Sequence, residues 1–225
     1  MKKIVFIMMA MLMAVIPSTA QNYKHSKYYN QKTGHLDYGF NNKGVDTYYG
    51  IRIGPGFSYV TSDDSRLDGG DWQTGLNVGV VAGFPLTYSD PLYLETGLYY
   101  IEKGGKKSLG GGKKMTYDLN YLEIPVVVKY KYEIDDDLTI EPFAGGYFAA
   151  GVGGKIKNFV EREAQSSFRS DNFRRLDGGL RIGCGIGYDM FYADLTYDIG
   201  LANICHDTFD KARNRAVMLN FGVNF

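Results

Sequence analysis

The end of the chain alternates strictly between two kinds of side chain. Val217, Leu219, Phe221, Val223 and Phe225 fall on one face, and small or polar residues fall on the other. A β-strand has a side-chain period of two, so this stretch predicts a strand with one wholly apolar face. About ten residues is also the length that a tilted strand needs to cross a bilayer. Because an unpaired apolar edge promotes aggregation, the pattern favours a closed barrel whose outer surface meets lipid.

The same period of two recurs along the chain from Tyr48 onward. In each repeat, apolar side chains occupy one face, and charged, small or glycine residues occupy the other. The predicted strands lie near Tyr49–Val60, Thr74–Phe84, Leu92–Glu102, Tyr117–Tyr132, Leu138–Val152, Asp177–Tyr188, Phe191–Leu201 and Ala216–Phe225. Together they predict an all-β fold, an eight-stranded antiparallel up-and-down transmembrane β-barrel within residues 48–225.

The connections between these strands alternate between short and long. The short ones are Pro85–Pro91, Glu133–Asp137 and Asp189–Met190, and the long polar ones are Thr61–Gln73, Lys103–Thr116, Gly153–Leu176 and Ala202–Arg215. Since successive antiparallel strands reverse direction, all short turns lie at one end of the barrel and all long loops at the other. Outer-membrane barrels have short periplasmic turns and longer external loops. The pattern therefore predicts a protein of the cell outer membrane.

The first twenty residues predict a signal peptide, residues 1–20. Two lysines precede the apolar run Ile4–Ile16, and small residues follow it up to Ala20, as a signal peptidase requires. The run is shorter than the roughly 20 residues of a membrane-spanning helix. Residues 21–47 are polar and without periodicity, and we expect them to form a periplasmic lead-in to the barrel.

Nine charged side chains fall on the face opposite the apolar one. They are Arg52, Glu95, Glu123, Lys129, Lys131, Glu141, Arg181, Asp194 and Asp198. An Arg or Lys that faces lipid costs about 2–4 kcal/mol near the bilayer midplane, so these residues are expected to face the lumen. A soluble lipocalin-like barrel would have the reverse arrangement, with an apolar interior and a polar exterior.

The interior of an eight-stranded barrel is just wide enough for side chains to fill it, so the lumen charges are expected to pair with one another. The expected pairs are Glu123 with Lys129 or Lys131, and Arg52 or Arg181 with Glu95, Glu141 or Asp194. This predicts a salt-bridged, plugged lumen and a structural or surface-interaction role. The alternative is a narrow channel for ions or very small solutes, although a selective pore would favour an excess of one sign of charge.

Two strand motifs are similar to those of a known family. The segment Tyr121–Tyr130 reads YLEIPVVVKY, and the segment Glu95–Gly104 reads ETGLYYIEKG. They resemble the paired "YLEIP…KY" and "TGLYY…KG" strands of the PorT-like outer-membrane β-barrel family of Bacteroidota, over about Tyr48–Phe225. The resemblance implies an outer-membrane barrel. The family's namesake assists a secretion system for C-terminally tagged proteins, so an accessory role in protein secretion across the outer membrane is a further alternative.

The third long loop is the best candidate for recognition of a partner. It combines Arg162, Arg169 and Arg174 with Phe168 and Phe173, and aromatic residues and Arg are enriched where proteins contact partners. We expect a surface or secretion protein as the partner there.

Two further partners follow from the predicted barrel. Outer-membrane lipid and lipopolysaccharide would surround it. The last strand, with Phe221, Val223 and Phe225, would present the assembly signal to the barrel-assembly machinery.

The sequence predicts no chemistry. Its 25 basic and 25 acidic residues give a net charge of zero, which leaves no electrostatic case for a nucleic-acid partner. His25, His35 and His206 have no metal-ligand neighbour at a useful spacing, and no strand presents a nearby Ser–His pair. Cys184 lies on an apolar face and is interpreted as a small hydrophobic residue. We therefore expect no cofactor, no metal and no enzymatic activity.

Overall fold

The computed structural model describes residues 47–63, 71–87, 90–108, 114–135, 137–158, 162–168, 173–205 and 211–225. The strands are β1 (Tyr48–Ser62), β2 (Gln73–Pro85), β3 (Leu92–Ser108), β4 (Lys114–Tyr130), β5 (Tyr132–Asp135), β6 (Leu138–Gly153), β7 (Lys155–Asn158), β8 (Arg162–Ser166), β9 (Leu176–Tyr188), β10 (Phe191–Gly200) and β11 (Ala212–Asn224). Within these ranges no helix is long and apolar enough to cross a membrane. The predicted signal peptide and lead-in lie outside the described residues, apart from Thr47.

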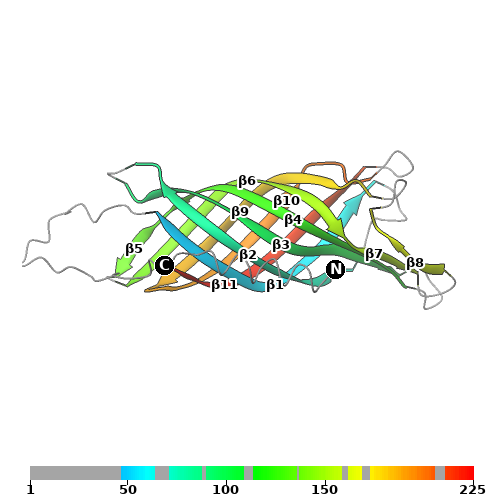
Figure 1. The fold of residues 1–225 in the computed structure, drawn as a ribbon, viewed down its shortest axis with the longest axis horizontal. Helices are drawn as coiled ribbons and strands as arrows, with labels where there is room; N and C mark the ends of the chain where they lie inside the picture. Colours follow the sequence, from blue (N-terminus) through cyan, green and yellow to red (C-terminus); the bar gives the residue numbers. More distant parts are fainter. Residues whose placement is uncertain are drawn as a thin grey trace, which may run out of the picture. The chain divides into compact units, whose positions relative to one another are not determined.

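Eight of the strands form a closed antiparallel barrel, which confirms the predicted fold (Figure 1). Each strand pairs with the next one in the order β1, β2, β3, β4, β6, β9, β10 and β11, and β11 pairs in turn with β1. This closing pair joins Gly50 to Asn224 at one end and Ser62 to Ala212 at the other. Because a bilayer core offers no partners for backbone polar groups, closure is what allows these strands to span lipid.

Three short strands extend the barrel strands at its two ends. β5 follows β4 after Lys131 and pairs with β6, whereas β7 follows β6 after Gly154 and pairs with both β4 and β8. Gly154 has a φ of 145°, and a Cβ there would lie 2.0 Å from the carbonyl oxygen of Asp118. Only glycine permits this close approach, which lets the chain continue from β6 into β7.

Three of the predicted long loops are wrong in extent, and the last of them, Ala202–Arg215, ends earlier than predicted because β11 begins at Ala212. Most of the segment Lys103–Thr116 is strand, because β3 runs to Ser108 and pairs with β4 down to Lys114. The segment is rich in Gly and Lys and lacks an apolar face, so its pairing with a neighbour and not its own pattern keeps it extended. The predicted loop Gly153–Leu176 likewise contains β7 and β8.

Side chains alternate between the two faces of the barrel as the sequence predicts. On β10, Leu195 is 56% exposed on the outer face, whereas its neighbours Asp194 and Thr196 are buried. The outer face forms an apolar belt, and the polar side chains fill the lumen. We call the end of the barrel at the short turns the turn end and the opposite end the loop end.

Aromatic side chains border the apolar belt at both ends. The turn-end girdle comprises Tyr49, Phe84, Tyr130, Tyr188 and Phe191, and the loop-end girdle comprises Tyr59, Trp72, Tyr100, Phe148 and Tyr197. Along β1, Tyr49 and Tyr59 are separated by roughly 33 Å of strand, which at the usual tilt corresponds to about 25 Å along the barrel axis. That height matches the hydrocarbon band of an outer-membrane barrel.

Candidate functional site

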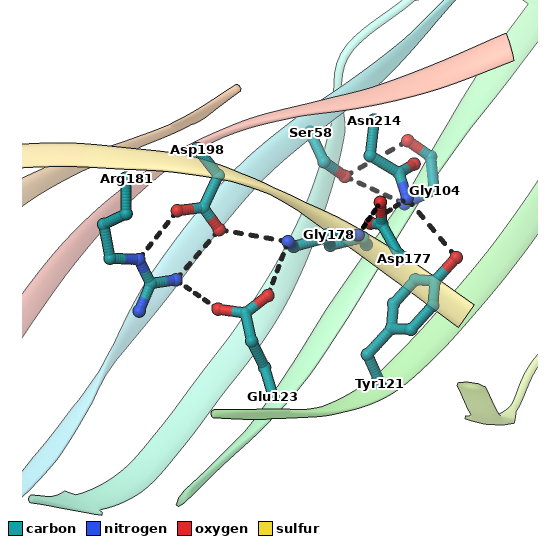
Figure 2. Close-up of polar contacts among 10 residues, drawn as sticks. Ser58, Gly104, Tyr121, Glu123, Asp177, Gly178, Arg181, Asp198 and Asn214 are labelled. Atoms are coloured by element: carbon teal, nitrogen blue, oxygen red, sulfur yellow. Dashed lines mark hydrogen bonds and ion pairs between the residues drawn. The ribbon is translucent and has the colours of Figure 1, made fainter. Parts of the chain in front are cut away.

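Four charged side chains from four strands meet in the lumen and form what we call the central quartet. Lys103 comes from β3. Glu123 comes from β4, Arg181 from β9 and Asp198 from β10 (Figure 2). All four point inward because each occupies the inward phase of its strand. Their side chains are between 0 and 6% exposed, so each charge must be compensated within the protein.

The quartet is a closed ring of ion pairs. The Lys103 ammonium donates to Glu123 Oε2 at 2.7 Å and to Asp198 Oδ2 at 3.0 Å. The Arg181 guanidinium donates from Nε to Asp198 Oδ1 at 2.7 Å, and from Nη2 both to Asp198 Oδ2 at 2.9 Å and to Glu123 Oε1. Two cations and two carboxylates therefore cancel, and the lumen carries no excess of one charge at this level.

A second charged group lies nearer the turn end. Lys129 donates to Glu95 Oε2 and to the Tyr192 hydroxyl, each at 2.8 Å, and Glu141 lies 3.5 Å from the same ammonium. The Tyr48 hydroxyl donates to Glu95 at 2.6 Å. The group joins β1, β3, β4, β6 and β10, so it ties most of the barrel wall together.

Two further cations at the turn end rest on aromatic rings. Arg52 lies 3.9 Å from the ring centre of Tyr192 and donates to Asn224 Oδ1 at 2.6 Å. Lys131, which is half-buried, lies 3.6 Å from the ring centre of Tyr48. A ring face stabilises a desolvated cation electrostatically, so these contacts replace some of the lost hydration.

Asp194 differs from the other lumen carboxylates because no cation of the described residues lies within ion-pair distance. Its Oδ1 accepts hydrogen bonds from Thr196 and Asn220, each at 2.7 Å. A cavity of about 10 Å³ lies beside these three residues, and Asn220 Oδ1 has no hydrogen-bond partner within the described ranges. That volume is about the space of one water molecule.

An apolar cluster lies at the loop end of the lumen, and we call it the loop cap. Tyr117 and Tyr121 of β4 pack there with Phe168, Phe173 and Ile204 from the segments that connect the strands. The rings of Tyr117 and Phe173 stack at 5.5 Å, and those of Tyr121 and Phe168 meet edge-on at 5.6 Å. A backbone bridge joins Phe173 to Cys205, and both residues are buried in this cluster.

The expected exposure of the third loop's aromatic residues is wrong. Phe168 and Phe173 are 6% and 4% exposed, because the barrel mouth offers them an apolar surface on β4. Arg174 is exposed. Arg162 lies in β8, and Arg169 lies outside the described residues. The structure therefore does not bring these five residues together as one exposed surface.

The structure places eight of the nine predicted lumen charges in buried positions, and Lys131 in a half-buried one. The expected pairing of Glu123 with Lys129 or Lys131 is wrong, since Glu123 pairs with Lys103 and Arg181. Glu123 and Lys129 are on the same strand, six residues and about 20 Å apart, so they cannot meet.

Arg52 and Arg181 also have partners that differ from those expected. Arg181 pairs with Asp198 and Glu123, and Arg52 with Asn224. Lys103 was missed because it was assigned to a loop. It continues the inward phase of Tyr99 and Ile101, and this alternation is the signal that could have identified it.

Deeper toward the loop cap, Asp177 accepts a hydrogen bond from Asn214 at 2.8 Å, and Asn214 also donates to the Tyr121 hydroxyl at 3.3 Å (Figure 2). Cys184 is exposed on the outer face and Cys205 is buried in the loop cap, and the two do not form a disulfide. In the described part of the chain, no group of three or more His, Cys, Asp or Glu residues is arranged to hold a metal ion. The site thus consists, among the described residues, of charged side chains that pair with one another or contact polar and aromatic neighbours.

The predicted assembly-signal residues lie at the turn end of β11. Phe221 is 51% exposed on the apolar belt, Val223 is half-exposed, and Phe225 follows the end of the strand. They occupy the same outer face as Leu219, which continues the belt toward its middle.

Comparison with solved structures finds other outer-membrane barrels at low sequence identity. Ail of Yersinia pestis, in complex with the heparin analogue sucrose octasulfate, is 17% identical over 80% of this chain and 99% of that one, with a TM-score of 0.42. Neisserial surface protein A is 13% identical over 80% and 97% of the two chains, with a TM-score of 0.44. A major outer membrane protein of Thermus thermophilus is 14% identical over 80% and 100%, with a TM-score of 0.48.

No curated protein matches the chain. The family model described as outer membrane protein beta-barrel domain matches residues 20–206, which is most of the chain and includes the strands of the barrel up to β10. Together with the closed barrel, its apolar belt and its girdles, this places the protein in the outer membrane. The chain belongs to the outer membrane protein beta-barrel domain family.

Proposed function

We propose that this small outer-membrane barrel is a closed, non-conducting protein with a structural or surface-interaction role and no enzymatic activity. The central quartet is the observation that carries the proposal. Its ring of ion pairs crosses the lumen from β3 and β4 to β9 and β10, and all four side chains are buried. A permeating ion would have to break at least one of these pairs in a desolvated environment, which is costly.

The loop cap supports the same proposal as a second barrier. It covers the loop end with packed aromatic and aliphatic side chains, and such a constriction excludes water and ions. The two barriers have different chemistry, so a change that opens one of them leaves the other in place.

Single-channel recording in a planar bilayer tests this proposal. The wild-type barrel should give no steady open events at any voltage the bilayer withstands. A double variant, Glu123→Ala with Arg181→Ala, should also stay closed because the loop cap remains. Steady openings of the wild-type protein would contradict the proposal and favour the narrow channel instead.

The narrow channel has one observation in its favour. Asp194 has no cationic partner among the residues described, and the small cavity beside it has room for a water molecule. Such a site could serve as a step for a cation or a proton. The quartet lies on one side of this site and the Lys129 group on the other, so an ion would still have to pass both charged groups. The channel is therefore the second candidate.

The two strand motifs favour a more specific alternative: the protein belongs to the PorT-like branch and assists protein secretion. Deletion of the gene should then reduce secretion of proteins with a C-terminal tag. If the barrel is only structural, the deletion should leave that secretion unchanged. We further expect that residues 1–20 are removed on export, which N-terminal sequencing of the purified protein would test.

A further inference from the structure

The outer face of β11 changes character toward the loop end. From the turn end, its outward side chains are Phe221, Leu219 and Val217, followed by Arg215, Arg213 and Lys211 just before the strand. We call the last three the β11 basic edge. They occupy the phase that faces lipid elsewhere on the strand, whereas Ala212 and Asn214 between them are buried.

The cations of the β11 basic edge form no ion pair with a carboxylate of the described residues, unlike others at the loop end. Lys157 lies 3.3 Å from Asp118, and the Arg175 guanidinium donates to the Gly151 carbonyl at 2.9 Å. The edge therefore presents three cations on an outward surface, none of them in an ion pair with a described carboxylate.

The edge begins at the membrane boundary. Arg215 is the cross-strand partner of Tyr59, whose ring lies 4.5 Å from that of Trp72 in the loop-end girdle. Arg and Lys cost little stability at the interface of a barrel, because their stems lie along apolar surface while the charge reaches polar groups. The cations therefore lie at the depth of lipid head groups.

A cavity of about 270 Å³ lies at the same place, lined by Thr61, Ser62, Asp63, Lys211 and Arg213. Two cations and two hydroxyl groups line it, against one carboxylate. The Asp63 N–H donates to the Lys211 carbonyl at 3.1 Å and joins the two chain segments that form the cavity. The Thr61 hydroxyl already donates to the Arg213 carbonyl at 3.4 Å, so Lys211 and Arg213 are the groups that suit a phosphate.

The two rims of the barrel also differ in charge. The exposed charged residues described at the turn-end rim are acidic, namely Asp90, Glu133, Asp135, Asp137 and Asp189. At the loop-end rim, the cations outnumber the acidic residues among the residues described. The acidic residues are Asp63, Asp71, Glu102 and Asp118. The cations are Lys106, Lys107, Lys155, Lys157, Arg174, Arg175, Lys211, Arg213 and Arg215. An anionic lipid surface would be repelled by the first rim and attracted by the second.

We propose that the β11 basic edge and its cavity bind the phosphate groups of lipid A in the outer leaflet. The inference rests on the proposed surface-interaction role and on the prediction that the long connections lie outside the cell. Free phosphate would use the cations alone, whereas a lipid also uses the apolar surface directly below them. Val217 and Leu219 continue the edge into the belt, so acyl chains can lie beneath a phosphate held at Arg213 and Arg215.

The intact protein in phosphatidylcholine nanodiscs provides the test. Trp72 is the only tryptophan of the chain and belongs to the adjacent girdle, so its fluorescence reports binding at this place. Lipid A should bind with an affinity that falls as salt rises, and lipid A without its phosphates should bind far more weakly. The triple variant Lys211→Gln, Arg213→Gln, Arg215→Gln should weaken binding roughly 100-fold, since each cation near an anionic lipid surface contributes about fivefold.

Matched variants separate this edge from general surface charge. Lys155→Gln with Lys157→Gln removes two loop-end charges on β7, which pairs with β4 and β8 and not with β11. Because salt screens exposed charges over about 10 Å, this variant should change the affinity by less than about threefold. Asp63→Asn should tighten binding, because it removes the one carboxylate of the cavity.

Two results would overturn the proposal directly: equal binding of lipid A with and without its phosphates, or wild-type affinity of the β11 triple variant. Complete competition by inorganic phosphate at millimolar levels would also overturn it, because it would indicate a site for free anions. None of these depends on conductance, so the same preparations recorded in planar bilayers show separately whether the barrel is closed.

Discussion

Arg181 and Asp198 are direct cross-strand partners on β9 and β10. The guanidinium of Arg181 donates hydrogen bonds to both carboxylate oxygens of Asp198, at 2.7 and 2.9 Å. This two-point contact fixes the orientation of both side chains. Asp198 is then positioned to accept from Lys103 as well, so the register of one strand pair sets the geometry of the whole quartet.

Lys103→Met should be strongly destabilising. It leaves Glu123 and Asp198 with a single cation between them in a buried position, and removal of one partner of a buried ion pair costs about 3–5 kcal/mol. Urea unfolding in detergent micelles would measure the loss. The double variant Lys103→Met with Glu123→Gln should regain part of it, because the charges balance again. A stability equal to wild type for Lys103→Met alone would show that the quartet contributes little.

A cation on the apolar belt should cost stability according to its depth. Leu195 lies in mid-strand on the outer face of β10, so Leu195→Arg should lower the free energy of unfolding in lipid vesicles by about 2–4 kcal/mol. Tyr188→Arg places the same charge in the turn-end girdle and should cost at most about 1 kcal/mol. Equal costs at the two positions would contradict the membrane placement of the belt.

Phe173→Ala should loosen the loop cap. The ring is buried against Tyr117, and loss of a buried Phe side chain costs about 3–5 kcal/mol of local packing. We expect faster cleavage of the loop-end connections by an external protease, without conductance, because the quartet still closes the lumen. Phe148→Ala removes a ring that is 72% exposed and serves as the control, which should be cleaved like wild type.

Phe225→Asp should impair assembly in the outer membrane. The last strand must be recognised and inserted, and a charge at its end disrupts the apolar face shared with Phe221 and Val223. The fraction of barrel that reaches the membrane folded should fall, as judged by migration on gels with and without heating. Met190→Asp adds a charge at the same end but in a turn, and it should assemble normally. Normal assembly of Phe225→Asp would mean that the residue carries no signal.

The period of two was enough to predict all eight barrel strands and the face on which their side chains lie. The pattern is sufficient because residues that face lipid must be apolar and residues that face the lumen can be polar. The apolar Leu195 therefore indicates the outer face, and the charged Asp194 indicates the lumen. The strand from Lys103 to Ser108 was missed because it extends past the belt, where no apolar face is required. There, only cross-strand pairing with β4 holds the chain extended.

The partners within the lumen could not be predicted from the sequence. Which charges meet depends on the stagger of the strands around the barrel, and Lys103 meets Asp198 across a separation of 95 residues. The burial of Phe168 and Phe173 could not be predicted from the sequence either. An aromatic residue in a polar connection can contact a partner or fold onto its own barrel, and the apolar mouth formed by Tyr117 and Tyr121 decides between the two.

The closing pair of β1 and β11 joins residues that are up to 174 positions apart, from Gly50 to Asn224. It also lacks paired residues at Gly54 and Pro55, since proline has no N–H to donate. Because this pair closes the longest chain segment, it has the largest loop-closure cost of the eight strand pairs, and we expect it to form late in folding. Any helper that delivers the barrel into the membrane would be expected to hold these two edges apart until the rest of the wall has formed.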